Sequence, residues 1–149
     1  MTLLRDKKGQ ALVEMALSIM LLMLILVGIF EFGRAMYIKN TLNNAARAGA
    51  RQAVVTSGIK LADAPASFTK LSSMHLDNAS IQATITNSLF NGIIKDNVEV
   101  NLYNATNAGT SAAKGDTIQV TVKLTDFEAF TKLIPIPDQL SGTASMRYE

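Results

Sequence analysis

One acidic residue stands inside the most apolar segment of the chain, a few positions after a run of basic residues. Lys7, Lys8 and Gly9 lead directly into this segment, and Glu14 lies within it. Cutting the chain after Gly9 would give Gln10 a free α-ammonium group and would make Glu14 the fifth residue. A carboxylate in a medium of low dielectric is tolerated when it meets an opposite charge. A cut at this position would therefore place a positive charge in the same stretch of chain as the acid.

A second explanation of Glu14 needs no cleavage. A carboxylate near the centre of a bilayer costs about 2.5 to 3.5 kcal/mol on insertion scales. In the first turn of a helix, close to the interface, that cost is small, and an acid there gains about 0.3 to 1 kcal/mol from the helix dipole. The residues alone leave both explanations open.

The segment that contains Glu14 has the length of a membrane-spanning helix. From Met15 to Phe30 every residue is apolar or glycine except Ser18. The stretch 10–30 is close to the ~20 residues that a helix needs to cross the hydrocarbon layer. A cleaved secretory signal has a shorter apolar core that ends promptly in an Ala-x-Ala site, and the nearest such site here is far downstream, at 46–48. A retained anchor is therefore favoured over a removed signal.

The basic residues before this segment predict its orientation. Arg5, Lys7 and Lys8 precede it, and the positive-inside tendency keeps such residues in the cytoplasm. We therefore expect residues 1–9 to form a cytoplasmic leader, 10–30 the transmembrane segment and 31–149 an extracytoplasmic domain.

The helix is expected to continue beyond the membrane segment, because residues 31–56 keep helical spacing and Ser57-Gly58 provides a stop. Small residues gather on one face of this continuation: Ala45, Ala46, Gly49 and Ala53. They would let the helix of a neighbouring molecule approach closely, or they would pack on the sheet of their own domain. The apolar spacing favours the second arrangement.

The remaining pattern predicts one further helix and a small sheet. A spacing of four in the apolar residues indicates a helix at 79–91, and alternation indicates strands at 98–103, 117–124 and 142–149. The first two strands are expected to form an antiparallel hairpin with a long flexible tip. The predicted fold is α+β and pilin-like: a long N-terminal helix, membrane-spanning in its first half, packed on a small antiparallel sheet with one additional helix.

Other classes of function find little support in the 149 residues. The net charge of +2, without basic residues interleaved with aromatics, argues against nucleic acid as a partner. The lack of cysteine excludes disulfides and thiolate metal sites. His75 is the only histidine, with Asp77 as its close acid, so we expect no metal, no cofactor and no catalytic residue. Asn78 and Asn104 begin glycosylation sequons, a weak three-residue pattern.

The stretch "KKGQALVE" resembles the processing site of type IV prepilins. The longer run "GQALVEMALSIMLLMLILVGIFEFGRAMYIKNTLNNAARAGARQAV" and the closing "LSGTASMRYE" resemble TadE-like proteins, the pseudopilins of tight-adherence (Tad, or Flp) pilus systems. This resemblance implies cleavage between Gly9 and Gln10, with Glu14 as the acid of processing and assembly. Met15 stands where Flp-type prepilins usually have an aromatic residue. Gln10 replaces the phenylalanine of ordinary type IV pilins, which leaves N-methylation open.

The resemblance implies a structural role rather than an enzymatic one. It predicts a pseudopilin of the bacterial inner membrane, cut by a prepilin peptidase and acting with other pilin or pseudopilin subunits in pilus assembly for surface adhesion. Its partners would be that peptidase, those subunits and the lipid of the inner membrane. The alternative is a single-pass anchored binding domain that is never cut, and a membrane-anchored enzyme is a remote third possibility.

Overall fold

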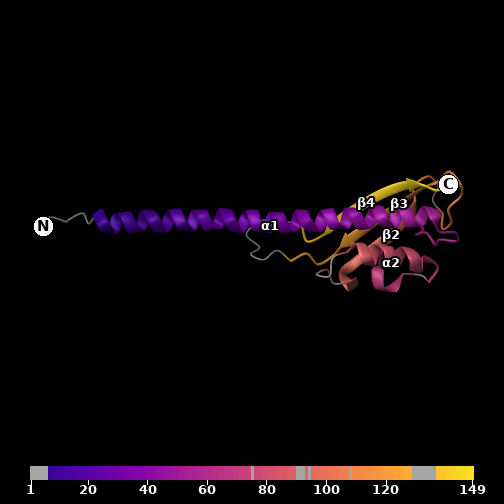
Figure 1. Ribbon diagram of the computed structural model, residues 1–149, viewed down its shortest axis with the longest axis horizontal. Coiled ribbons are helices and arrows are strands. Elements are labelled where there is room, and N and C mark those ends of the chain that lie inside the picture. The colour runs from indigo at the N-terminus through magenta and orange to yellow at the C-terminus, as the bar shows by residue number, and fades with distance from the viewer. Residues whose placement is uncertain (1–6, 75, 90–92, 94, 108, 129–136) are drawn as a thin grey trace. The chain divides into compact units, whose positions relative to one another are not determined.

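The computed structural model describes residues 7–74, 76–89, 93, 95–107, 109–128 and 137–149. The chain divides into two compact units, Met1–Arg34 and Ala35–Glu149. The helix α1, Lys7–Val55, forms the described part of the first unit and continues into the second (Figure 1). It begins three residues before the predicted start and ends one residue before the predicted end.

In the first unit, α1 presents exposed apolar side chains. Leu12 and Met20 are each 69% exposed, and Phe30 is 68% exposed. Among the described residues, α1 is long and apolar enough to cross a membrane, and none of its most apolar 18-residue window is buried. Such a helix is compatible with a membrane anchor, because its apolar surface is more favourably placed in lipid than in water.

The second unit contains a four-stranded antiparallel sheet in the order β1-β2-β3-β4. The strands are β1 Thr69–Lys70, β2 Val98–Asn104, β3 Thr117–Leu124 and β4 Leu140–Arg147. One further α-helix, α2, spans Ala79–Ser88, and short 3-10 helices span Leu71–Ser73, Leu76–Asn78 and Lys95–Asn97. Together with α1, these elements form the predicted α+β, pilin-like arrangement.

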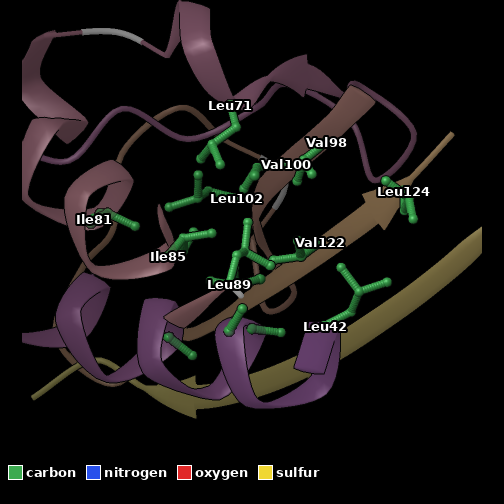
Figure 2. Close-up of a cluster of buried hydrophobic side chains, with 14 of the residues drawn as sticks. Leu42, Leu71, Ile81, Ile85, Leu89, Val98, Val100, Leu102, Val122 and Leu124 are labelled. Carbon is green, nitrogen blue, oxygen red and sulfur yellow. The ribbon is translucent and has the colours of Figure 1, made fainter. Parts of the chain in front are cut away.

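The core of the second unit lies between one face of the sheet and the two helices. Leu42 of α1 and Ile81 and Ile85 of α2 are fully buried, and so is Val122 of β3. Figure 2 shows these side chains gathered with those of β2 in one cluster. The long helix therefore serves as the cover of its own sheet in this unit.

The hairpin of β2 and β3 is confirmed, and its register follows from alternating apolar residues. Val100 of β2 faces Val122 of β3, and Leu102 faces Val120. All four are buried. A slip of one residue would turn every one of these side chains to the opposite face, so burial fixes the pairing.

The predicted stop of α1 is confirmed. The helix ends at Val55, and Gly58 has a φ of 73°. This is the left-handed region that glycine adopts without the steric cost of a Cβ atom. The chain therefore leaves α1 in a turn that places Ile59 in the core, where it is buried.

Other elements also differ from the sequence prediction. Helix α2 ends at Ser88 rather than at 91, because Leu89 adopts an extended conformation and is buried in the core. Strand β4 begins at Leu140 rather than 142, because Leu140 pairs with Leu124 and is itself buried. The two-residue strand β1 was not predicted, since Thr69 and Lys70 are exposed and carry no alternating pattern.

The connection between β2 and β3 is organised around a buried carboxylate. Asp116 is 5% exposed. Its carboxylate accepts hydrogen bonds from the N–H of Ala113 (2.9 Å), from Nδ2 of Asn104 (2.7 Å) and from Nδ2 of Asn107 (2.8 Å). The backbone donor of Ala113, followed by Asn104, lowers the pKa of Asp116, and burial acts in the opposite direction. The tip that the sequence predicted as flexible is thus tied down at these residues.

Candidate processing and assembly site

The candidate processing bond lies in the first turn of α1. Lys7 and Lys8 begin the helix, Gly9 is half-buried and Gln10 is exposed. Arg5 lies outside the described residues. The first four N–H groups of a helix have no acceptor within the helix. A glycine there weakens the turn by about 1 kcal/mol relative to alanine. Unwinding this turn to present the bond to a peptidase therefore breaks few hydrogen bonds.

Glu14 lies one helical turn after Gln10 and is exposed. Residues four apart on a helix are neighbours on one face. The hydroxyl of Ser18 donates to the main-chain carbonyl of Glu14 at 2.9 Å, so this bond does not use the Glu14 carboxylate. The structure thus places the candidate N-terminal residue and the candidate acid side by side along one helix, with the carboxylate at the surface.

The small residues of the second half of α1 lie in the core of the second unit. They are Ala45, Ala46, Gly49 and Ala53, and the three alanines are 0% exposed. A Cβ atom on Gly49 would lie 2.8 Å from Cγ1 of Ile85 and 3.4 Å from Cγ1 of Val120. The packing partners of Gly49 in this structure are therefore α2 and β3 of the same domain. This is the arrangement that the apolar spacing favours.

Strand β4 approaches α1 at a second glycine. A Cβ atom on Gly142 would overlap the backbone of Leu42 and Asn43. Backbone atoms within a helix cannot rotate away as the end of a side chain can, so only glycine fits at this position. The contact fixes where β4 lies along α1.

The asparagines of both predicted sequons are buried, and their side-chain amides form hydrogen bonds within the domain. Asn78 is 4% exposed; its Nδ2 donates to the carbonyl of Lys60 (2.8 Å), and its Oδ1 accepts from the N–H of Lys60 (3.0 Å). Asn104 is 1% exposed and donates to Asp116. A glycan on either amide would require this part of the domain to open. Sequence patterns gave no sign of these contacts, because they join residues far apart in the chain.

The described residues contain no group of three or more His, Cys, Asp or Glu side chains that could hold a metal ion. His75, which the sequence singled out, lies outside them. Glu31, just beyond the most apolar segment, is buried at 1% exposed.

Comparison with protein families gives a match to the N-terminal part of the chain. The family model described as TadE-like protein matches residues 9–51. Over these residues the chain is similar to the TadE-like family. The match confirms the resemblance inferred from the sequence over those residues. Comparisons with curated proteins and with solved structures found no match.

The TadE-like segment includes the bond between Gly9 and Gln10, the acid Glu14, and the helical face up to Gly49. The matched segment ends at residue 51, four residues before the end of α1 at Val55. The similarity of "LSGTASMRYE" to the same family lies outside the matched residues and stays a prediction.

Proposed function

We propose that the protein is a pseudopilin, a minor pilin-like subunit of a tight-adherence pilus system, and that it acts in pilus assembly for surface adhesion. The TadE-like match over residues 9–51 carries this proposal. The fold supports it as well. The first half of α1 has exposed apolar side chains, and the second half packs on a small sheet. The role is structural, through contacts with other pilin or pseudopilin subunits.

The same helix supports the membrane placement that we propose. The exposed apolar side chains of residues 12–30 would lie in the lipid of a bacterial inner membrane. The basic residues Lys7 and Lys8 would stay in the cytoplasm, and the sheet domain would lie in the periplasm. Assembly would then carry that domain to the outside of the cell.

A prepilin peptidase would cut this anchor after Gly9, leaving Gln10 as the first residue. The first helical turn opens at low cost, and Glu14 would remain as an acid one turn inside the new helix. Such an acid is costly in lipid unless it finds a positive charge, which the N-terminal ammonium group of a neighbouring subunit would supply.

The test is the N-terminus and intact mass of the protein from membranes of cells with and without the peptidase. We expect a chain that begins at Gln10 only when the peptidase is present, and Gly9→Ala should slow or abolish the cut. Gly33→Ala is a matched control, because Gly33 is also in α1 and nothing lies within 4 Å of its Cβ position. A chain that begins at Met1 in both strains would contradict the proposal and favour an uncut, anchored binding domain.

A further inference from the structure

Gln10 carries both groups needed to close a ring on itself once its α-amine is free. The α-nitrogen and the carboxamide carbon Cδ of a glutamine are separated so that their bond completes a five-membered lactam. In the structure Gln10 is exposed, and its neighbour Ala11 is small and exposed as well. The described surroundings of this residue leave room for the ring.

We propose that the N-terminus released by cleavage after Gly9 cyclises to pyroglutamate. This inference rests on the proposed function, because the amine exists only after that cleavage. The neutral α-nitrogen attacks Cδ, the bond from the α-nitrogen to Cδ forms and the bond from Cδ to Nε2 breaks. One proton of the amine passes to Nε2, which leaves as ammonia. Reactant and products balance without an oxidant, a reductant or a second substrate.

The position of Gln10 on α1 favours the uncharged product. The amine would stand at the start of a helix whose first N–H groups lack acceptors, so the positive end of the helix dipole would face a positive charge. The part of α1 that is apolar enough to cross a membrane begins at Gly9, which would put the same charge at the edge of the lipid. Ring closure removes the charge and with it both unfavourable interactions.

Cyclisation competes with the role proposed for the ammonium group. Glu14 lies one turn along the same helix, and a carboxylate near an amine holds that amine in its charged form. Only the neutral amine attacks Cδ. The mature subunit therefore has two exclusive states. In one, a free ammonium group pairs with a Glu14 side chain; in the other, a neutral lactam cannot form this pair. Ring closure converts the first state into the second.

The experiment measures the intact mass of mature full-length protein, extracted quickly from native membranes without proteolytic digestion. We expect a population of chains that begin at Gln10, are lighter by one ammonia and have an N-terminus that amine-reactive reagents do not label, beside chains that keep the free amine. Pyroglutamyl aminopeptidase should remove the blocked residue and restore labelling at Ala11.

The matched control is Gln10→Asn, which keeps the carboxamide but is one methylene shorter. Its ring would have four members and would be strongly strained, so this variant should be cut, keep its full mass and react with the label. Ammonia loss that persists in Gln10→Asn would come from elsewhere in the chain and would overturn the assignment. Glu14→Gln should raise the cyclised fraction measured soon after the peptidase is induced, and an unchanged fraction would reject the competition.

The remaining outcomes separate the two proposals. Chains that begin at Gln10 and all carry a free or methylated amine would overturn cyclisation and leave the pseudopilin proposal standing. A chain that begins at Met1 would reject both.

Discussion

Gly142 of β4 lies against the backbone of Leu42 in α1, so closely that a Cβ atom on residue 142 would stand 2.6 Å from the Leu42 carbonyl oxygen. The obstructing atoms belong to the main chain of a helix. Strand β4 therefore reaches its partner β3 and covers the core only because its third residue has no side chain.

Gly142→Ala should destabilise the domain strongly. The added methyl group has no room, so β4 or α1 must shift, and overpacking of this kind costs about 1 to 3 kcal/mol or more. The measurement is the free energy of unfolding by denaturant of the full chain in detergent. Gly109→Ala is the control, because the nearest atom to its Cβ position is 3.9 Å away. Equal stabilities of the two variants would show that β4 does not pack as described.

Gly49→Ala should also be unfavourable, but through a side chain rather than the backbone. Alanine gains about 1 kcal/mol over glycine within a helix, yet its Cβ would lie 2.8 Å from Cγ1 of Ile85. We expect a net loss in the wild-type background and a net gain in Ile85→Ala, where that atom is gone. A double-mutant cycle of unfolding free energies measures this change of sign. Additive effects would mean that residues 49 and 85 do not touch.

Stability should fall in acid because of Asp116. Its pKa is lowered in the folded state by the N–H of Ala113 and the amide of Asn104, relative to about 3.9 in an unfolded chain. The stabilisation is therefore fully present above about pH 4 and is lost as the pH falls through the folded-state pKa.

Asp116→Asn should flatten the stability profile in that acid range and lower the melting temperature at pH 7. It removes the negative charge and turns one of the two accepting oxygens into an NH2 donor, so the three hydrogen bonds cannot all be kept. Melting temperature against pH is the measurement. Asp126→Asn, at an exposed carboxylate, should leave the profile close to that of the wild type. Parallel profiles for Asp116→Asn and the wild type would contradict the role given to this carboxylate.

Glu14→Ala separates the two explanations of that acid. If Glu14 pairs with a neighbouring ammonium group, the variant should still be cut but should assemble poorly, because removal of one partner of a buried pair costs about 3 to 5 kcal/mol. The fraction of protein in sheared pili, compared with the fraction cut, is the measurement. If Glu14 is only an interfacial acid, assembly should be unchanged and membrane insertion equal or better.

Local sequence patterns were enough to predict the elements that depend on the apolar face of one strand or on the conformation of one turn. Alternation placed β2 and β3, since Val100, Leu102, Val120 and Val122 all face the core. Gly58 marked the end of α1, since its conformation is one that glycine alone adopts readily. The spacing of Gly9, Gln10 and Glu14 identified the candidate site, and the matched family covers all three.

Contacts between distant residues lay beyond those patterns. Asn78 stands at the N-cap position of α2, but its amide binds the backbone of Lys60 and does not cap the helix. Asp116 is one acid in a polar loop, and only the fold brings Asn104 to it. Leu89 would have continued α2 on its own spacing, but burial in the core turns it out of the helix.

The position of β4 also sets the order in which the domain is completed. Synthesis makes α1, α2 and the β2–β3 hairpin first, and β4 follows them all. Until β4 is added, one edge of β3 has no strand paired with it, and the surface of α1 around Leu42 is exposed. Unpaired strand edges and exposed apolar surfaces promote association with other chains. After β4, Tyr148 joins the end of the chain to the residues before β3. Its N–H donates to the carbonyl of Asp116, and its carbonyl accepts from the N–H of Gly115, both at 2.7 Å. A chain that has not yet added β4 would therefore expose this strand edge and this helix surface, and would associate with other chains more readily.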